Sequence, residues 1–166
     1  MKRTISILVE NHAGVLSRIT GLFSRRGFNI DSLAVGVTDN PAVSRITIVA
    51  DGNDYTLEQL EKQLNKLIEV IKVKTLEKDE LLARELLMVK LSVNADKRSE
   101  VLTICEIMGA KVIDISLSTM TLEISDTYFH LVRFEEMIKP YGIIEMVRTG
   151  TIAIQKGSET ITAKGR

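Results

Sequence analysis

Apolar residues near the start of the chain change from a period of two to the spacing of a helix. In residues 5–10, Ile5, Ile7 and Val9 alternate with Ser6, Leu8 and Glu10, which is typical of a strand with one face in a core. From Val15 onward, apolar side chains recur every three or four positions and form one stripe on a helix. A polar turn at residues 11–14 lies between these elements. The stripe consists of Val15, Leu16, Ile19, Leu22 and Phe23.

The rest of the first half supplies three more strands and one more helix. Residues 29–37 and 43–50 alternate as strands around a turn signal at 38–41, which predicts a hairpin. We expect Thr56 to cap the helix that follows and residues 71–75 to form the fourth strand. The order β-α-β-β-α-β is that of a ferredoxin-like fold, whose second sheet face needs another cover. The stripe of the helix consists of Leu57, Leu60, Leu64, Leu67 and Ile68.

The second half repeats this order of elements, although it does not repeat the sequence. It has a strand near 87–93, a helix ended by Gly109, two strands, a further helix closed by Pro140 and Gly142, and a last strand that 151–154 continue. We therefore predict an α+β protein of two tandem ferredoxin-like domains. The predicted parts are a first domain at 1–77, a linker at 78–82, a second domain at 83–156 and a polar, disordered tail at 157–166.

The composition argues against several classes of function. The 22 basic and 22 acidic residues balance, so the sequence lacks the electrostatic signature of a nucleic-acid partner. No apolar run approaches the roughly 20 residues of a membrane span, and the start of the chain lacks the apolar stretch of a signal peptide. We therefore expect a soluble, cytoplasmic protein that binds neither nucleic acid nor a membrane.

The sequence also lacks the residue patterns of a catalytic or metal site. His12 and His130 are the only histidines and lie in different halves. No spacing fits a zinc site, a phosphate-binding loop or a nucleophile elbow. Cys105 is the only cysteine, so it can form no intramolecular disulfide, and its place on an apolar stripe predicts burial in the core.

One enzymatic alternative shares the predicted fold. Acylphosphatases have the ferredoxin-like order and use an arginine phosphate cradle with a water-positioning asparagine. Arg18 and Asn29 could be assigned these roles, but the glycine-rich loop that carries the arginine in that family is absent. Because a shared fold does not imply shared chemistry, we reject this activity. A hydrolysis assay on an acyl phosphate would test it.

The polar turn carries binding chemistry. N–H groups at a helix start have no partners inside the helix, and with the helix dipole they favour a carboxylate. Asn11 adds an amide that donates and accepts, and Gly14 has no side chain to block a ligand. A purely structural interpretation stays open: Asn11 can cap the helix, and Gly14 can supply an unusual φ angle.

Long stretches of the chain resemble the small, regulatory subunit of acetohydroxyacid synthase, also called acetolactate synthase. The most specific region is 5–49, with LVENHAGVLSRITGLFSRRGFNIDSLAVG and then SRITIV. It contains the ACT-domain pattern, in which a strand ends in N-x-x-G-V-L and G-x-N-I begins the next strand. The similarity is looser over 94–138. Further matching stretches are LEQLEKQLNKLIEVIKV, ARELLMVKLSV and YGIIEMVRTGTIAI.

This resemblance implies a regulatory protein without chemistry or cofactors of its own. Such subunits associate with a separate catalytic subunit, which holds thiamine diphosphate, magnesium and FAD and makes acetolactate from pyruvate. They raise its activity and confer feedback inhibition by a branched-chain amino acid, usually valine. ACT domains pair side by side into an eight-stranded sheet with effectors at the interface, so the resemblance implies a homodimer whose first domain is an ACT domain.

The family motif also implies which residues hold the effector. The amides of residues 13–16 would take the carboxylate, oxygens of Asn11 and Asn29 would accept from the ammonium group, and apolar side chains would shape the pocket. His12 has only a flanking role. The implied effector residues are Asn11, Ala13, Gly14, Val15 and Leu16 of one protomer with Asn29 and Ile30 of the facing one.

A regulator of another class is an alternative: a stand-alone, amino-acid-responsive protein acting on gene expression. It would need an element that reads DNA, and the sequence shows no helix-turn-helix with a basic recognition helix. Specific binding in a gel-shift experiment would favour it.

Overall fold

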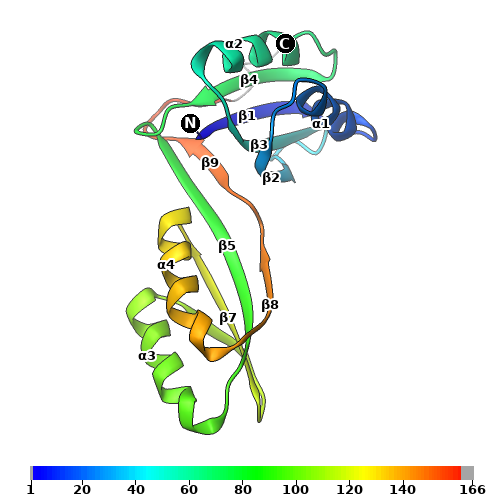
Figure 1. Cartoon of the computed structure of the whole chain (residues 1–166). Coiled ribbons are helices and arrows are strands. Elements are labelled where there is room, and N and C mark those ends of the chain that lie inside the picture. The colour runs from blue at the N-terminus through cyan, green and yellow to red at the C-terminus, as the bar shows by residue number, and fades with distance from the viewer. Residues whose placement is uncertain (1, 162–166) are drawn as a thin grey trace. The chain divides into compact units, whose positions relative to one another are not determined.

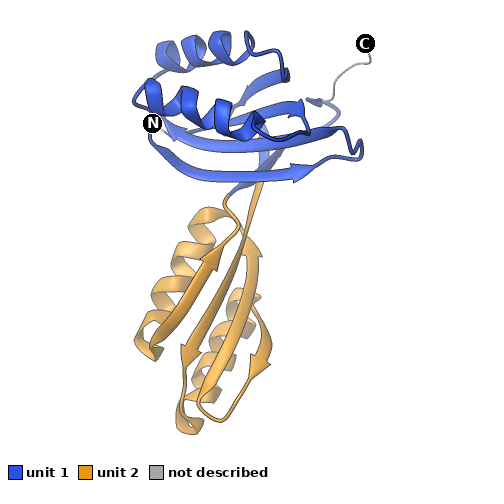
Figure 2. Cartoon of the chain, turned by 90° about the vertical axis from the view of Figure 1, so that its right-hand side faces the viewer, with its two compact units in different colours: residues 1–82, 151–166 blue, residues 83–150 orange. Residues whose placement is uncertain are grey.

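Each half of the chain folds into its own antiparallel sheet, and two helices cover one face of that sheet (Figure 1). The computed structural model describes residues 2–161. Unit 1 comprises the chain up to residue 82 and again from residue 151, and unit 2 comprises residues 83–150 (Figure 2). Both units have the order β-α-β-β-α-β, which confirms the predicted α+β fold of two tandem ferredoxin-like domains.

Unit 1 is built around its two central strands. The sheet order is β2-β3-β1-β4, so β2 and β4 are the edges. The stripes of both helices pack on alternate residues of the strands, as their periods predict, and form one buried core. The elements are β1 (Lys2–Glu10), α1 (Val15–Arg25), β2 (Ile30–Val37), β3 (Val43–Asp51), α2 (Asp54–Leu64) and β4 (Val70–Leu76).

Unit 2 repeats the topology with the order β6-β7-β5-β8. Its core contains the predicted apolar positions of β5 and β7, and Gly109 ends α3 with a φ of 73°, as a left-handed cap does. The elements are β5 (Leu81–Ser92), a 3-10 turn (Ala95–Lys97), α3 (Arg98–Met108), β6 (Lys111–Ile115), β7 (Thr119–Asp126), α4 (Tyr128–Ile138), a second 3-10 turn (Lys139–Tyr141) and β8 (Ile143–Arg148).

Helix α2 begins and ends earlier than the sequence predicts. Asn53 is its N-cap, and Thr56 is the third helical residue: Asn53 Oδ1 accepts from Thr56 N at 2.8 Å, and Thr56 Oγ1 accepts from Asn53 N at 3.1 Å. This reciprocal capping box satisfies two donors at the helix start. At the other end, Leu67 N bonds to Leu64 O, a tighter turn that ends the helix. Ile68 is therefore 89% exposed and does not belong to the stripe.

The predicted continuation of the last strand at residues 151–154 is confirmed in part, because the strand formed there pairs with β5, as β8 does, but it is separate from β8. After Gly150, which has a φ of 79°, the chain forms a separate strand, β9 (Ile152–Gln155), grouped with unit 1. It covers the sheet face that the helices leave open, where Arg45 Nη2 donates to Ala153 O at 2.8 Å. The compact unit 2 comprises residues 83–150, and β5 begins inside the predicted linker.

The predicted polar tail is partly ordered. Lys156 N, just before the tail, donates to Glu80 O at 2.7 Å, and Ile161 within it is only 4% exposed. The tail residues beyond 161 lie outside the described residues.

Cys105 is buried in the core of unit 2, as predicted, and burial raises the pKa of its thiol. A raised pKa lowers the thiolate fraction at any given pH, and the thiolate is the reactive form. We expect native protein at pH 8 to react with a thiol reagent such as Ellman's reagent at least about tenfold more slowly than unfolded protein. Absorbance kinetics with and without denaturant would check this, and equal rates would contradict the burial of Cys105.

Candidate functional site

The turn between β1 and α1 presents an uncapped helix start. Gly14 is the N-cap in a left-handed conformation, with a φ of 89°, and no described side chain caps the helix. The first helical bond runs from Arg18 N to Gly14 O at 3.1 Å. The N–H groups of residues 15–17 therefore have no partner inside the helix. Together with the helix dipole, they make this end of α1 suited to a carboxylate.

Asn11 does not cap the helix, so this part of the structural interpretation is wrong, whereas Gly14 does supply an unusual φ angle. Its Nδ2 donates to Pro41 O at 2.8 Å, and its Oδ1 accepts from Ser44 Oγ at 3.0 Å. Asn11 thus ties the turn to the β2–β3 hairpin. Because an amide oxygen has two lone pairs, Oδ1 keeps the capacity to accept one further hydrogen bond.

The other turn residues differ in how they face the solvent. A Cβ atom at Gly14 would meet no described atom within 4 Å, so the space above it is open. Val15 is 4% exposed and its side chain belongs to the core, which leaves its N–H group as its possible contribution to a ligand. Leu16 is 39% exposed. Ala13 is exposed in the turn itself.

Within one chain, the structure does not bring the two halves of the predicted site together. Ile30 pairs with Ala50, which lies opposite Arg3 at the start of β1. The turn follows Glu10 at the other end of β1, opposite Val43. Asn29 and Ile30 therefore lie at one end of the sheet and residues 11–16 at the other. This separation within one chain follows from the strand register.

The neighbours of Asn29 form a small polar cluster. Asn29 Nδ2 donates to Asp31 Oδ1 at 3.2 Å, and Lys2 Nζ lies 3.3 Å from Asp31 Oδ2. The register of β2 against β3 shifts between Ile30 and Ser32, so Asp31 is the extra residue of a β-bulge. Bulges change the direction of side chains and are frequent beside binding sites.

The remaining polar groups near the turn do not form a catalytic arrangement. His12 is exposed, with Nε2 3.3 Å from Glu10 Oε2 and Nδ1 3.1 Å from Ala13 O. Arg18 forms an ion pair with Glu69, whose side chain is buried. Arg18 therefore has a structural partner, and Asn29 lies at the far end of the sheet. This geometry removes the arginine–asparagine pair that the acylphosphatase alternative needs.

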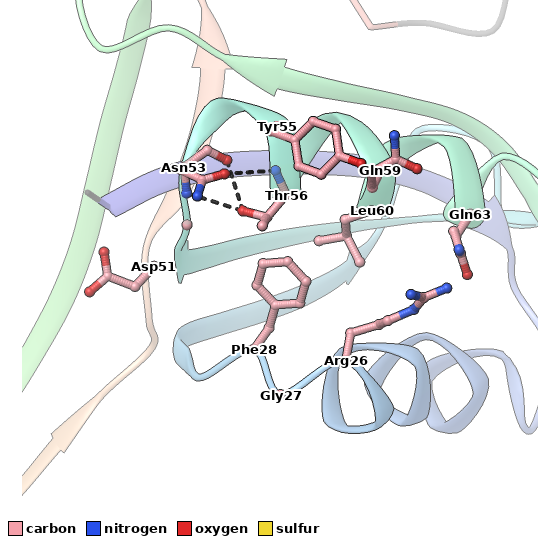
Figure 3. A pocket seen from close by; sticks show the side chains of 11 residues that line it. Arg26, Gly27, Phe28, Asp51, Asn53, Tyr55, Thr56, Gln59, Leu60 and Gln63 are labelled. Atoms are coloured by element: carbon pink, nitrogen blue, oxygen red, sulfur yellow. Dashed lines mark hydrogen bonds between the residues drawn. The ribbon is translucent and has the colours of Figure 1, made fainter.

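A pocket of about 550 Å³ lies elsewhere in unit 1, where the end of α1 meets the start of α2 (Figure 3). Phe28 and Leu60 face each other inside it, with Arg26 and Gln63 on one side and Asp51 on the other. None of the predicted effector residues lines this pocket. Sequence reasoning missed it because its walls come from two segments, 26–28 and 51–63, that only the tertiary structure brings together.

Residues 2–161 contain neither a cluster of metal-binding side chains nor a helix suited to cross a membrane. No three His, Cys, Asp or Glu side chains there are grouped so that they could hold a metal ion. None of the helices there has the length and apolar character that a membrane crossing requires.

Two family models match the chain, one for each half. Residues 5–72 match the model described as AHAS small subunit-like ACT domain, and residues 84–157 match the model described as small subunit of acetolactate synthase. The chain belongs to the acetolactate synthase small-subunit family. Its first domain is accordingly an ACT domain, as the resemblance predicted.

Individual relatives cover nearly the whole chain. The acetolactate synthase small subunit of Mycolicibacterium smegmatis is 43% identical over 160 residues, which cover 96% of this chain and 94% of the relative. The probable acetolactate synthase small subunit of Archaeoglobus fulgidus is 42% identical over 96% of this chain and 99% of its own length. The crystal structure of the Thermotoga maritima small subunit has a TM-score of 0.89 at 34% identity, covering 96% of this chain and 99% of that one.

Proposed function

We propose that this chain is the regulatory subunit of an acetolactate synthase. In this proposal it activates a separate catalytic subunit in the cytoplasm and makes that subunit sensitive to valine or a related branched-chain amino acid. Membership of the acetolactate synthase small-subunit family supports the catalytic subunit of that enzyme as the partner. The catalytic subunit would hold thiamine diphosphate, magnesium and FAD, and this chain would contribute no cofactor.

The edge strand β2 supports a homodimer. Val35 and Val37 are 48% and 59% exposed on this edge, where a second sheet can pair. If two β2 strands pair antiparallel about a two-fold axis, residue 30 of one protomer lies near residue 37 of the other. Val37 pairs with Ser44, whose side chain bonds to Asn11. Dimerisation would therefore bring the Asn29 end of one chain toward the turn of the other.

The single observation that carries the effector site is the uncapped start of α1 beside Gly14. The N–H groups of residues 15–17 would bind the carboxylate of valine. The ammonium group would donate to oxygens of Asn11 and of the partner's Asn29, and the side chain would lie against Leu16 and Ile30. Val15 would contribute its N–H alone, because its side chain is committed to the core.

A site shared by two protomers suits feedback regulation. Ligand binding and quaternary geometry are then linked, so valine shifts the assembly toward the arrangement that it binds better. A tenfold preference for one arrangement corresponds to about 1.4 kcal/mol.

Calorimetric titration with valine tests the effector site. Asn29→Ala is the informative variant, because Asn29 is exposed and its recorded side-chain bond is to Asp31, whereas Asn11 also holds the hairpin. We expect saturable binding by the wild type and at least about tenfold weaker binding by Asn29→Ala, since an unmet charged donor costs about 1.5 kcal/mol or more.

Asn94→Ala is the matched control, since Asn94 is also exposed but lies in unit 2. It should bind valine like the wild type. Equal affinity of Asn29→Ala would remove Asn29 from the site. If the isolated chain does not bind, the same titration is made on the reconstituted holoenzyme, and no binding or inhibition there would overturn the effector role.

A further inference from the structure

Residues 151–156, which we name the strap, form three hydrogen bonds to strands of the unit 1 sheet on its open face, and β9 within the strap also pairs with β5. Thr151 N donates to Ser32 Oγ at 2.7 Å. Arg45 Nη2 donates to Ala153 O at 2.8 Å, and Lys74 Nζ donates to Gln155 Oε1 at 2.6 Å. The three anchors lie on three strands, β2, β3 and β4. The strap therefore has a defined position on the sheet.

The surface under the strap is polar and largely withdrawn from water. Ser6 and Thr47 are buried, at 0% and 3% exposure, and Arg45 Nε donates to Ser6 Oγ at 2.9 Å. Desolvation lowers the pKa of the Arg45 guanidinium. Buried polar groups are costly to leave unpaired, so the loss of a hydrogen bond to the strap would lower the stability of this part of the folded chain.

The first anchor lies next to the predicted effector residues. Ser32 follows Asp31, the bulge residue that accepts a hydrogen bond from Asn29 Nδ2. An ammonium group bound at Asn29 would lie beside the Asp31 carboxylate and compete with Asn29 for it. Because a bulge residue is unpaired in the ladder, its side-chain contacts help to set the local strand conformation, and Ser32 is the next residue.

The same end of the strap, Thr151, directly follows unit 2, whose last residue is Gly150. Thr149 belongs to unit 2 and is fixed to β5, since its N donates to Leu86 O and its Oγ1 accepts from Leu86 N, both at 3.1 Å. Gly150 follows in a left-handed conformation. Thr151 is then fixed to Ser32. Gly150 is thus the only residue between Thr149, which is bonded within unit 2, and Thr151, which is bonded to Ser32 in unit 1.

We propose that the Ser32–Thr151 hydrogen bond is the latch through which an effector bound at Asn29 and Ile30 acts on unit 2. This inference rests on the proposed function, and it specifies how effector binding in the ACT domain affects unit 2. Effector binding displaces Asp31 and Ser32. This displacement alters the hydrogen bond from Thr151 N to Ser32 Oγ, and the altered position of Thr151 is passed to β8 through Gly150. Ser32 is a positioning residue in this account and does not touch the effector.

The test uses the full chain reconstituted with the catalytic subunit. In Ser32→Ala the valine concentration for half-inhibition should rise about 2- to 12-fold, the range that one hydrogen bond provides. The isolated full chain should lose no valine affinity, because Ser32 does not touch the effector. Ser32→Thr keeps the hydroxyl and should restore wild-type inhibition. Ser24→Ala, an exposed serine on α1, is the matched control and should behave like the wild type.

Hydrogen exchange on the wild type tests the latch without any variant. Valine should change the exchange rate of the Thr151 amide, and an unchanged rate overturns the latch. Unchanged half-inhibition in Ser32→Ala overturns it too and leaves the effector site standing. An equal loss of binding and inhibition would place Ser32 in the site itself and also overturn the latch. A wild-type holoenzyme that valine does not inhibit overturns both the latch and the proposed function.

Discussion

Replacing Gly14 with aspartate is expected to abolish valine inhibition of the reconstituted enzyme. The new side chain would enter space that no described atom of the chain occupies, where the proposal places the valine carboxylate. Two like charges about 4 Å apart repel by about 4 kcal/mol at the effective dielectric constant of a protein surface, so affinity should fall at least about 100-fold. Inhibition curves from 1 µM to 100 mM valine, roughly spanning the expected shift, would measure it.

Two further variants separate charge from backbone strain in this experiment. Gly14→Asn has nearly the same shape without the charge, and asparagine tolerates left-handed backbone, so it should lose less affinity than Gly14→Asp. Gly109→Asp is the control for strain, since Gly109 has a φ of 73° and also no described atom within 4 Å of its Cβ position, but lies in unit 2. Full valine sensitivity in Gly14→Asp would exclude this turn as the carboxylate site.

The double variant Val35→Lys, Val37→Lys is expected to dissociate the homodimer and to abolish valine binding at the same time. Both valines lie on the exposed edge strand β2. Lysines there would each place an unpaired ammonium group in the interface, at a cost of several kcal/mol, and lysine at a sheet edge opposes pairing. Sedimentation equilibrium should then give the 18.5 kDa of a single chain.

Ile68→Lys is the matched control for the edge variant. Ile68 is 89% exposed in the turn before β4 and is not on the β2 edge. It should leave both the mass and the valine affinity unchanged. A double variant that remains dimeric would show that β2 is not the interface, and a monomer that still binds valine would show that one chain forms the site.

The sequence motif predicted one part of the site and did not predict another. The pattern N-x-x-G-V-L located a helix start with free N–H groups, and the structure has that feature at Gly14. The motif did not show that Asn11 is bonded to Pro41 and Ser44, which lie 30 and 33 residues further along the chain. Those facts depend on which segments meet, and a linear pattern does not contain that information.

The sequence by itself determined the two ferredoxin-like folds, because burial of apolar stripes in one core selects both the type and the order of the elements. The sequence did not predict where α2 ends. A tight turn at residues 64–67 ends the helix, although the apolar periodicity continues to Ile68. Local hydrogen bonds can end a helix while its hydrophobic pattern goes on.

Only the tertiary structure decided where residues 151–155 belong. Their alternation fits a strand of either unit, because periodicity reports that one face is buried and not which surface buries it. The choice was made by partners distant in sequence: Ser32, Arg45 and Lys74 offer a donor or acceptor to each part of the strap. Water is excluded from a sheet face with such polar groups only when the segment that covers it pairs with them through hydrogen bonds. These hydrogen bonds exist only in the folded chain.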